Sequence, residues 1–148
     1  MIKKEENNIL SMKENDIIAK LQGTFKAPTA NIILDRIGIP VTLKGLTRKE
    51  MELAKKNSIE RKKIKGQAEE RLNNALYDAN IIIAATTNFD WEAAKPDNIS
   101  DAAQFIMRKL LAGEITSLAS KVMELSGFGE ELDEEEEIKN SSEEAEEE

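Results

Sequence analysis

The chain begins with a polar stretch that contains one short apolar cluster. Most of residues 1–22 are charged or carry amide side chains, and Ile17, Ile18 and Leu21 form the cluster just before Gly23. Apolar side chains at this spacing lie on one face of a helix. The pattern therefore predicts a polar N-terminal lead, residues 1–23, with one short helix.

Residues 31–44 change to a pattern that is typical of paired strands. An apolar run at 32–34 is followed by a turn region with Gly38 and Pro40, and residues 41–44 then alternate between apolar and polar side chains. Two short strands joined by a turn are only marginally stable until another element packs on them. We therefore expect a β-hairpin at about 31–44 that is covered by helices.

A helix is expected directly after this hairpin. Thr47 and Glu50 have the spacing of a capping box, in which the Thr hydroxyl accepts from the N3 amide and the Glu carboxylate accepts from the N-cap amide. Met51 and Ala54 follow at helical spacing. The pattern predicts a helix that begins at this capping box.

A second, longer helix is predicted from Glu69 onward. Its apolar face holds six side chains: Leu72, Ala75, Leu76, Ala79, Ile82 and Ile83. Ile81 lies off this face, so either the end of the helix is buried on all sides or residues 81–83 form a short strand. We favour the helix.

Two further helices complete the predicted body. Ser100 is a candidate N-cap for the first, whose apolar stripe includes Ile106 and Leu110 and which Gly113 is expected to end. The second carries apolar side chains at helical spacing from residue 115 to 125. The predicted fold is therefore mainly α: a small helical domain with a short N-terminal β-hairpin, whose folded body spans residues 24–129.

The last helix is predicted to end in a Schellman motif. Gly127 can adopt the left-handed conformation at C′, and Phe128 at C″ can fold back on Met123 near C3. Residues 130–148 then hold 12 acidic side chains and a single basic one, Lys139. A segment with so much like charge and so few apolar groups is expected to stay disordered. The sequence thus predicts a disordered acidic C-terminal tail.

Composition argues against most enzyme classes. The chain has neither histidine nor cysteine, which removes imidazole bases, thiol nucleophiles and the usual zinc ligands. The acidic tail lacks the alternating ligands and central glycine of an EF-hand loop. We therefore expect no catalytic, cofactor-binding or metal-binding residues. The absence of a long apolar run predicts no membrane segment, and together with the lack of cysteine it favours a soluble cytoplasmic protein.

One basic stretch leaves three interpretations open. Six cations lie between Lys55 and Lys65, against one carboxylate, Glu60. They can form a solvated helix face, they can contact nucleic acid, or they can attract the acidic tail. No aromatic side chain lies among them to stack on bases, so no specific nucleic-acid partner is expected.

Phe105 is an unusual position on its predicted helix. A rotation of about 100° per residue places it almost opposite the apolar stripe of Ile106 and Leu110. Either a second layer such as Trp91 covers the ring, or the ring binds a partner.

Three segments, taken in order, resemble the XkdN-like phage tail assembly chaperones. They are "LDRIGIPVTLKGLTRKEMELAKK" at residues 34–56, "ALYDANIIIAATTNFDWE" at 75–92 and "LLAGEITSLASKVMELSGFGEE" at 110–131. Together the resemblance covers most of residues 24–131. It implies a small, mainly helical protein of a tailed phage or prophage that is needed for tail assembly and is absent from the finished particle.

The resemblance also implies partners. The expected client is the tape-measure protein, a long helical chain kept soluble until the tail tube polymerises around it, and the tail tube protein is a second expected partner. The location would be the cytoplasm of the bacterial host. From helical geometry we select Phe105 and the neighbouring Leu111 as candidate partner-binding residues. The competing hypotheses are an acidic regulator or nucleic-acid mimic that binds a basic partner, and a minor structural component of the tail.

Overall fold

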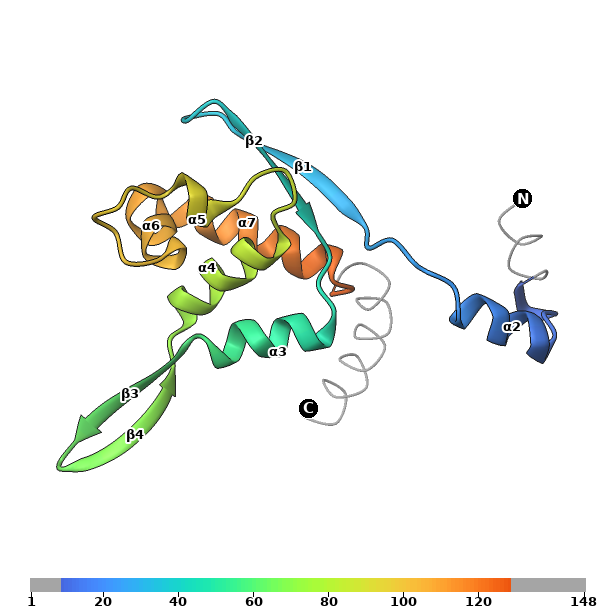
Figure 1. Cartoon of the computed structure of the whole chain (residues 1–148), viewed down its shortest axis with the longest axis horizontal. Coiled ribbons are helices and arrows are strands. Elements are labelled where there is room, and N and C mark those ends of the chain that lie inside the picture. The colour runs from blue at the N-terminus through green and yellow to red at the C-terminus, as the bar shows by residue number, and fades with distance from the viewer. Residues whose placement is uncertain (1–8, 129–148) are drawn as a thin grey trace, which may run out of the picture.

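The computed structural model describes residues 9–128 (Figure 1). Within this range the chain forms six helices and four strands. In order, they are α2 (Glu14–Leu21), β1 (Thr29–Leu34), β2 (Ile39–Lys44), α3 (Arg48–Lys56), β3 (Ile59–Ile64), β4 (Gln67–Leu72), α4 (Asn74–Ala85), α5 (Trp91–Ala94), α6 (Ala102–Lys109) and α7 (Ala112–Leu125).

The predicted N-terminal hairpin is confirmed. Strands β1 and β2 pair antiparallel, from Thr29 opposite Lys44 to Leu34 opposite Ile39. Their side chains alternate as expected for strands with one covered face. Val41 on β2 is fully buried, whereas Ile33 on the other face of β1 is exposed.

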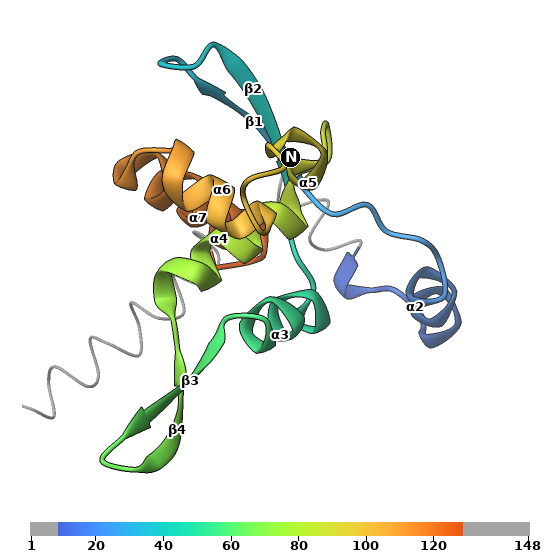
Figure 2. The same ribbon diagram turned by 60° about the vertical axis from the view of Figure 1, so that its left-hand side comes forward.

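Helices α3, α4, α6 and α7 pack together beneath this hairpin (Figure 2). Helix α4 is central, since it contacts α3, α6, α7 and β2. The largest fully buried apolar side chains of the core come from β2, α4, α6 and α7: Val41, Leu43, Ile81, Ile82, Ile106, Leu118 and Val122. We call β1, β2 and α3–α7 the body.

The prediction of a mainly α fold is wrong, because the structure is mixed α/β with two antiparallel hairpins. Residues 59–72, expected to be a basic helical stretch and the start of a helix at Glu69, form the second hairpin, β3–β4. At its turn Lys65 has φ 54° and Gly66 has φ 81°. Two consecutive residues with positive φ form the type I′ turn that matches the twist of a hairpin.

The next helix, α4, starts at Asn74, five residues later than the predicted start at Glu69. Asn73 is the N-cap of α4, and its side-chain oxygen accepts from the Leu76 amide at 3.1 Å. The prediction of a helix at residues 81–83 is confirmed, and Ile81 and Ile82 are both buried. The end of α4 is therefore enclosed on more than one side.

Helix boundaries near α6 also differ from the prediction. Asp101, not Ser100, caps α6, since its carboxylate accepts from the Gln104 amide at 2.8 Å. Helix α6 already ends at Lys109, and Gly113 lies in the first turn of α7. A residue at that place needs no positive φ, which is why a glycine there was a misleading stop signal.

The capping box and the Schellman motif are confirmed. The Thr47 hydroxyl accepts from the Glu50 amide, and the Glu50 carboxylate accepts from the Thr47 amide at 3.0 Å. At the end of α7 the Phe128 amide donates to the Met123 carbonyl and Gly127 has φ 101°. The Phe128 side chain nevertheless stays 58% exposed. The predicted acidic tail, residues 130–148, lies outside the described residues.

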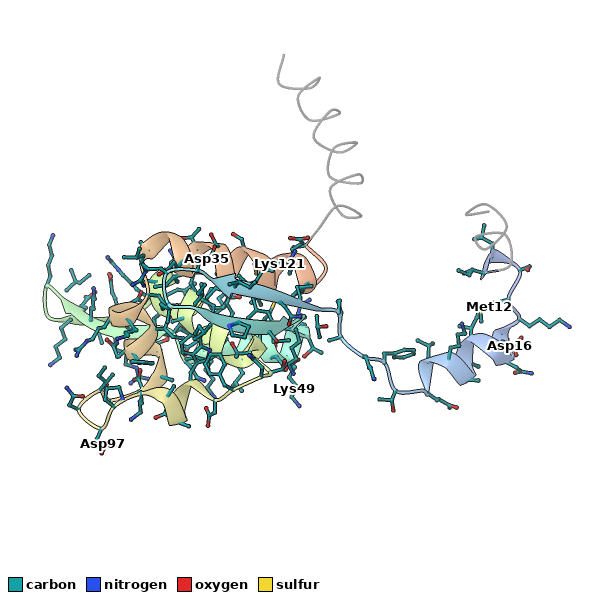
Figure 3. The ribbon with its side chains drawn as sticks, turned by 90° about the horizontal axis from the view of Figure 1, so that it is seen from above. Met12, Asp16, Asp35, Lys49, Asp97 and Lys121 are labelled. Atoms are coloured by element: carbon teal, nitrogen blue, oxygen red, sulfur yellow. The ribbon has the colours of Figure 1, made fainter. Side chains whose placement is uncertain are left out.

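Two elements extend from the body (Figures 1 and 2). Hairpin β3–β4 projects beyond the ends of α3 and α4, and neither of its strands has a buried side chain. Helix α2 lies apart from the body and is joined to β1 by residues 22–28. Figure 3 shows Asp16 on this helix and Met12 just before it. We call residues 9–28 the N-terminal arm.

Candidate partner-binding surface

The N-terminal arm presents apolar side chains that nothing in the described part of the chain buries. No residue of α2 is buried, and Ile17, Ile18 and Leu21 on one of its faces are exposed, Leu21 to 71%. Phe25, in the segment that leads to β1, is 67% exposed. An exposed apolar face of this kind on a helix is typical of a segment that docks on another protein.

Charges favour the helical form of α2 only weakly. Glu14 and Asp16 lie in the first turn and Lys20 in the last, which suits the helix dipole. The N-cap Lys13, however, forms no side-chain cap bond. A helix of two turns is marginal in water without tertiary packing. Burial of its apolar face against a partner would therefore stabilise α2.

A groove lies between α3 and the end of α7. Leu46, Met51, Tyr77 and Phe128 supply its apolar lining. Arg48, Glu52, Lys55 and Ser126 complete the lining. We call it the α3–α7 groove.

The arm is attached next to this groove. The Gly45 amide donates to the Pro28 carbonyl at 2.8 Å, which fixes the end of the arm beside β2. The following Leu46 amide donates to the Ser126 hydroxyl at 2.8 Å. A Cβ atom on Gly45 would collide with the Leu125 carbonyl, so only glycine lets the chain pass this closely. The arm, the groove and the end of α7 thus share one junction.

The structure places the two predicted partner-binding residues in different settings. Phe105 is partly buried, and its ring packs edge-on against Trp91 with centroids 6.4 Å apart. Trp91 thus covers part of the Phe105 ring, which is one of the two alternatives that the sequence left open. Leu111, the N-cap of α7, is 57% exposed. The two residues are therefore not equivalent as candidate contacts.

Leu111 is held at a charged junction between the β1–β2 turn and α7. Its amide donates to the Glu114 carboxylate at 2.8 Å, and Arg36 forms an ion pair with the same carboxylate at 2.6 Å. Hydrogen bonding by the Arg36 guanidinium is the main reason that the pKa of Glu114 lies below its ordinary value. Arg36 also donates to the Lys109 carbonyl at 3.2 Å. The backbone that carries Leu111 is thereby fixed to the body.

A second surface is charged rather than apolar. Six exposed cations follow one another along the last turn of α3, along β3 and into the turn after it: Lys55, Lys56, Arg61, Lys62, Lys63 and Lys65. Because side chains alternate along a strand, Lys62 lies on the opposite face of β3 from Arg61 and Lys63. We call them the basic ridge. Arg61 forms an ion pair with Glu70 at 3.2 Å, whereas the five lysines form none with any residue from 9 to 128. The ridge can therefore attract an anionic partner.

Sequence reasoning identified part of these surfaces. It found the cluster of Ile17, Ile18 and Leu21, but it did not assign that cluster to a binding site. Phe25 was missed, and the signal available for it was an aromatic residue in a short connector between Gly23 and Pro28. Within residues 9–128 no cluster of acidic side chains has the arrangement of a metal site. No helix in that range is both long and apolar enough to cross a bilayer.

Comparison with known families decides the assignment. A model described as the phage XkdN-like tail assembly chaperone protein matches residues 12–139, which is most of the chain. The chain belongs to this tail assembly chaperone family. No curated protein and no solved structure matched it in the corresponding searches.

Membership of the tail assembly chaperone family confirms the resemblance inferred from the sequence. The family is one of chaperones and not of enzymes. The match begins at residue 12, so helix α2, the α3–α7 groove and the basic ridge all lie within the region that the family shares. Residues 12–28 of the arm therefore lie within the matched region.

Proposed function

We propose that this tail assembly chaperone binds the tape-measure protein and keeps it soluble until the tail tube polymerises around it. It acts in the cytoplasm of the bacterial host and is not retained in the mature virion. Family membership supports the role in tail assembly. The choice of client rests on the chemistry of a long helical protein, whose apolar stripes need cover before the tube forms.

The observation that carries this proposal is the unpartnered apolar face of α2. Side chains at helical spacing, Ile17, Ile18 and Leu21, can pack against an amphipathic helix of the client. Phe25 adds an aromatic contact just beyond the helix. Covering the exposed part of each side chain is worth on the order of 1 kcal/mol. Individual contacts of this size are weak enough for tube subunits to displace them.

Leu111 and Phe105 form a second proposed contact. Leu111 is the cleaner candidate because most of its surface is free, and its loss would remove little packing in the body. Phe105 also packs against Trp91, so Phe105→Ala is expected to reduce stability as well as client binding. For this reason Leu111→Ala is the variant that separates binding from folding.

The test is co-expression with the tape-measure protein of the same locus, followed by size-exclusion chromatography with light scattering. We expect the tape-measure protein to become soluble and to co-elute with the chaperone. The variant Ile18→Ser/Leu21→Ser should lose at least about tenfold of this yield, because two apolar contacts are removed. Ile33→Ser is the matched control, since Ile33 is 67% exposed on the body.

Three results would count against the proposal. A tape-measure protein that stays insoluble in the presence of the chaperone would refute the choice of client. Equal yields from the arm variant and wild type would refute the assignment to α2. Detection of the protein in stoichiometric amounts in purified virions would favour a structural component of the tail.

A further inference from the structure

Five of the six cations of the basic ridge form no ion pair with any residue from 9 to 128. Glu60, the carboxylate within the ridge sequence, accepts from the Asn73 amide group at 2.8 Å and forms no ion pair with a described residue. Register places Arg61 opposite Glu70 and Lys62 opposite Glu69, but Lys63 lies opposite Ala68. Lys65 lies in the turn itself. The outer half of the hairpin therefore carries a surplus of positive charge.

The last described residue before the acidic C-terminal segment lines the same groove as the first cation of this ridge. Phe128 is the last described residue, and it lines the α3–α7 groove together with Lys55, the first residue of the ridge. Residues 130–148 hold 12 carboxylates and one lysine, which gives a net charge of −11. The most acidic segment of the sequence thus follows a residue that lines the same groove as the first lysine of the ridge.

The acidic segment is long enough to span the basic ridge, and its charges are grouped in a similar way. Strand β3 has six residues and spans about 20 Å, and the last turn of α3 adds about 5 Å. Residues 129–148 can extend over roughly 65–70 Å, so they can reach the tip of the hairpin with slack. The carboxylates form two blocks, 130–137 and 143–148. Likewise, the ridge has one pair of lysines on α3 and a second group from Arg61 to Lys65.

We propose that residues 130–148 bind the basic ridge of the same chain. Each exposed ion pair contributes little, but many pairs act together and the covalent link supplies a high effective concentration. The contact covers cations that would otherwise attract other polyanions, including nucleic acid. It concerns the free protein, so its test does not depend on the identity of the client.

Amide hydrogen exchange of the full-length chain measures this contact. A two-stranded hairpin with no buried side chain opens readily, so the exchange rates of β3–β4 ladder amides respond to anything that holds the hairpin closed. Converting all 12 carboxylates of residues 130–148 to amides should speed exchange at residues 59–72 by about three- to tenfold. Amides of α4 should be unchanged, because they report on the core.

Salt provides the matched control. Raising the salt concentration shortens the Debye length from about 30 Å at 0.01 M to about 3 Å at 1 M. In the wild type this should accelerate hairpin exchange as the substitutions do, and in the substituted chain it should have little effect. Equal exchange in the two chains at low salt would overturn the proposal.

Zero-length cross-linking of lysine to carboxylate identifies which lysines the acidic segment contacts, and whether the two groups belong to the same chain. We expect residues 130–148 to link to Lys55, Lys62, Lys63 and Lys65 in higher yield than to Lys13, Lys20 and Lys26 of the N-terminal arm. These three arm lysines likewise form no ion pair in the described range. Equal yields at both sets would overturn the proposal. A mixture of isotope-labelled and unlabelled chains separates links within one chain from links between chains. Links mainly between different chains would overturn the proposal and show that the acidic segment contacts a second copy.

Discussion

The two hairpins have the same length and pairing but very different surroundings. Each consists of two six-residue antiparallel strands in continuous register. Hairpin β1–β2 buries Leu34, Val41 and Leu43 against the helices. Hairpin β3–β4 buries none of its side chains. Regular strand pairing is therefore compatible with two distinct roles, one as a wall of the core and one as a projecting surface.

Their free edges differ in the same way. The outer edge of β2 bonds to the loop after α4, where the Thr87 amide donates to the Thr42 carbonyl at 2.9 Å. The Asn88 amide group accepts from the Thr42 amide and donates to the Pro40 carbonyl, each at 2.9 Å. Strands β3 and β4 pair only with each other among the described residues. Charged side chains protect such uncovered edges from pairing with other chains.

Truncation of one leucine in each hairpin should give the largest difference. Leu43 is fully buried, so Leu43→Ala leaves a cavity and should lower the free energy of unfolding by about 2–5 kcal/mol. Leu72, at the base of β3–β4, is 37% exposed, and Leu72→Ala should cost about 0.5 kcal/mol or less. Urea denaturation measures both. Similar losses would mean that the two hairpins contribute alike to the core.

Matched glycines in the two turns should separate global from local stability. Gly38 and Gly66 have φ values of 79° and 81°, and no atom would obstruct an added Cβ at either position. The cost of alanine is therefore conformational, about 1–2 kcal/mol. Gly38→Ala should lower the urea midpoint of the whole protein. Gly66→Ala should leave that midpoint nearly unchanged while it speeds amide exchange at residues 59–72, and a shift of the midpoint equal to that of Gly38→Ala would contradict this distinction.

The ion pairs of the two hairpins should give the smallest difference. Hydrogen bonds from Arg36 lower the pKa of Glu114 from 4.5, so this carboxylate contributes stability above pH 4.5 that is lost as the pH falls through the lowered pKa. Glu114→Gln should therefore flatten the acid side of the stability curve. Glu70→Gln, which removes the partner of Arg61, is the matched control and should leave that curve unchanged. Identical curves for Glu114→Gln and wild type would show that the Arg36 contact is not a source of acid sensitivity.

The elements predicted correctly from the sequence are those marked by a pattern of apolar residues or by a helix-capping motif. Alternation revealed β1–β2, and the capping box at Thr47 and the left-handed Gly127 gave two helix ends correctly. Hairpin β3–β4 was missed because its strands have almost no apolar alternation. Its visible signals were Gly66 after a lysine, and carboxylates spaced to face cations across the turn.

The candidate surface was only partly predictable for a different reason. Helical spacing could place Ile17, Ile18 and Leu21 on one face, but it could not tell whether another element covers them. Helical spacing also placed Phe105 away from the core stripe. It could not show that Trp91 from α5 packs against the Phe105 ring. Whether a side chain is free depends on tertiary contacts that a single helical pattern does not contain.

Hydrogen exchange of the chaperone with and without the tape-measure protein tests the central claim most directly. We expect fast exchange of α2 amides in the free protein, because no residue of α2 is buried. In the complex, exchange at residues 14–21 should slow by at least about tenfold, as expected when a marginal helix is held against a partner. Amides of β1–β2 should change little. A stable complex in which α2 exchanges as fast as in the free chaperone would contradict the assignment of the arm as the client-binding surface.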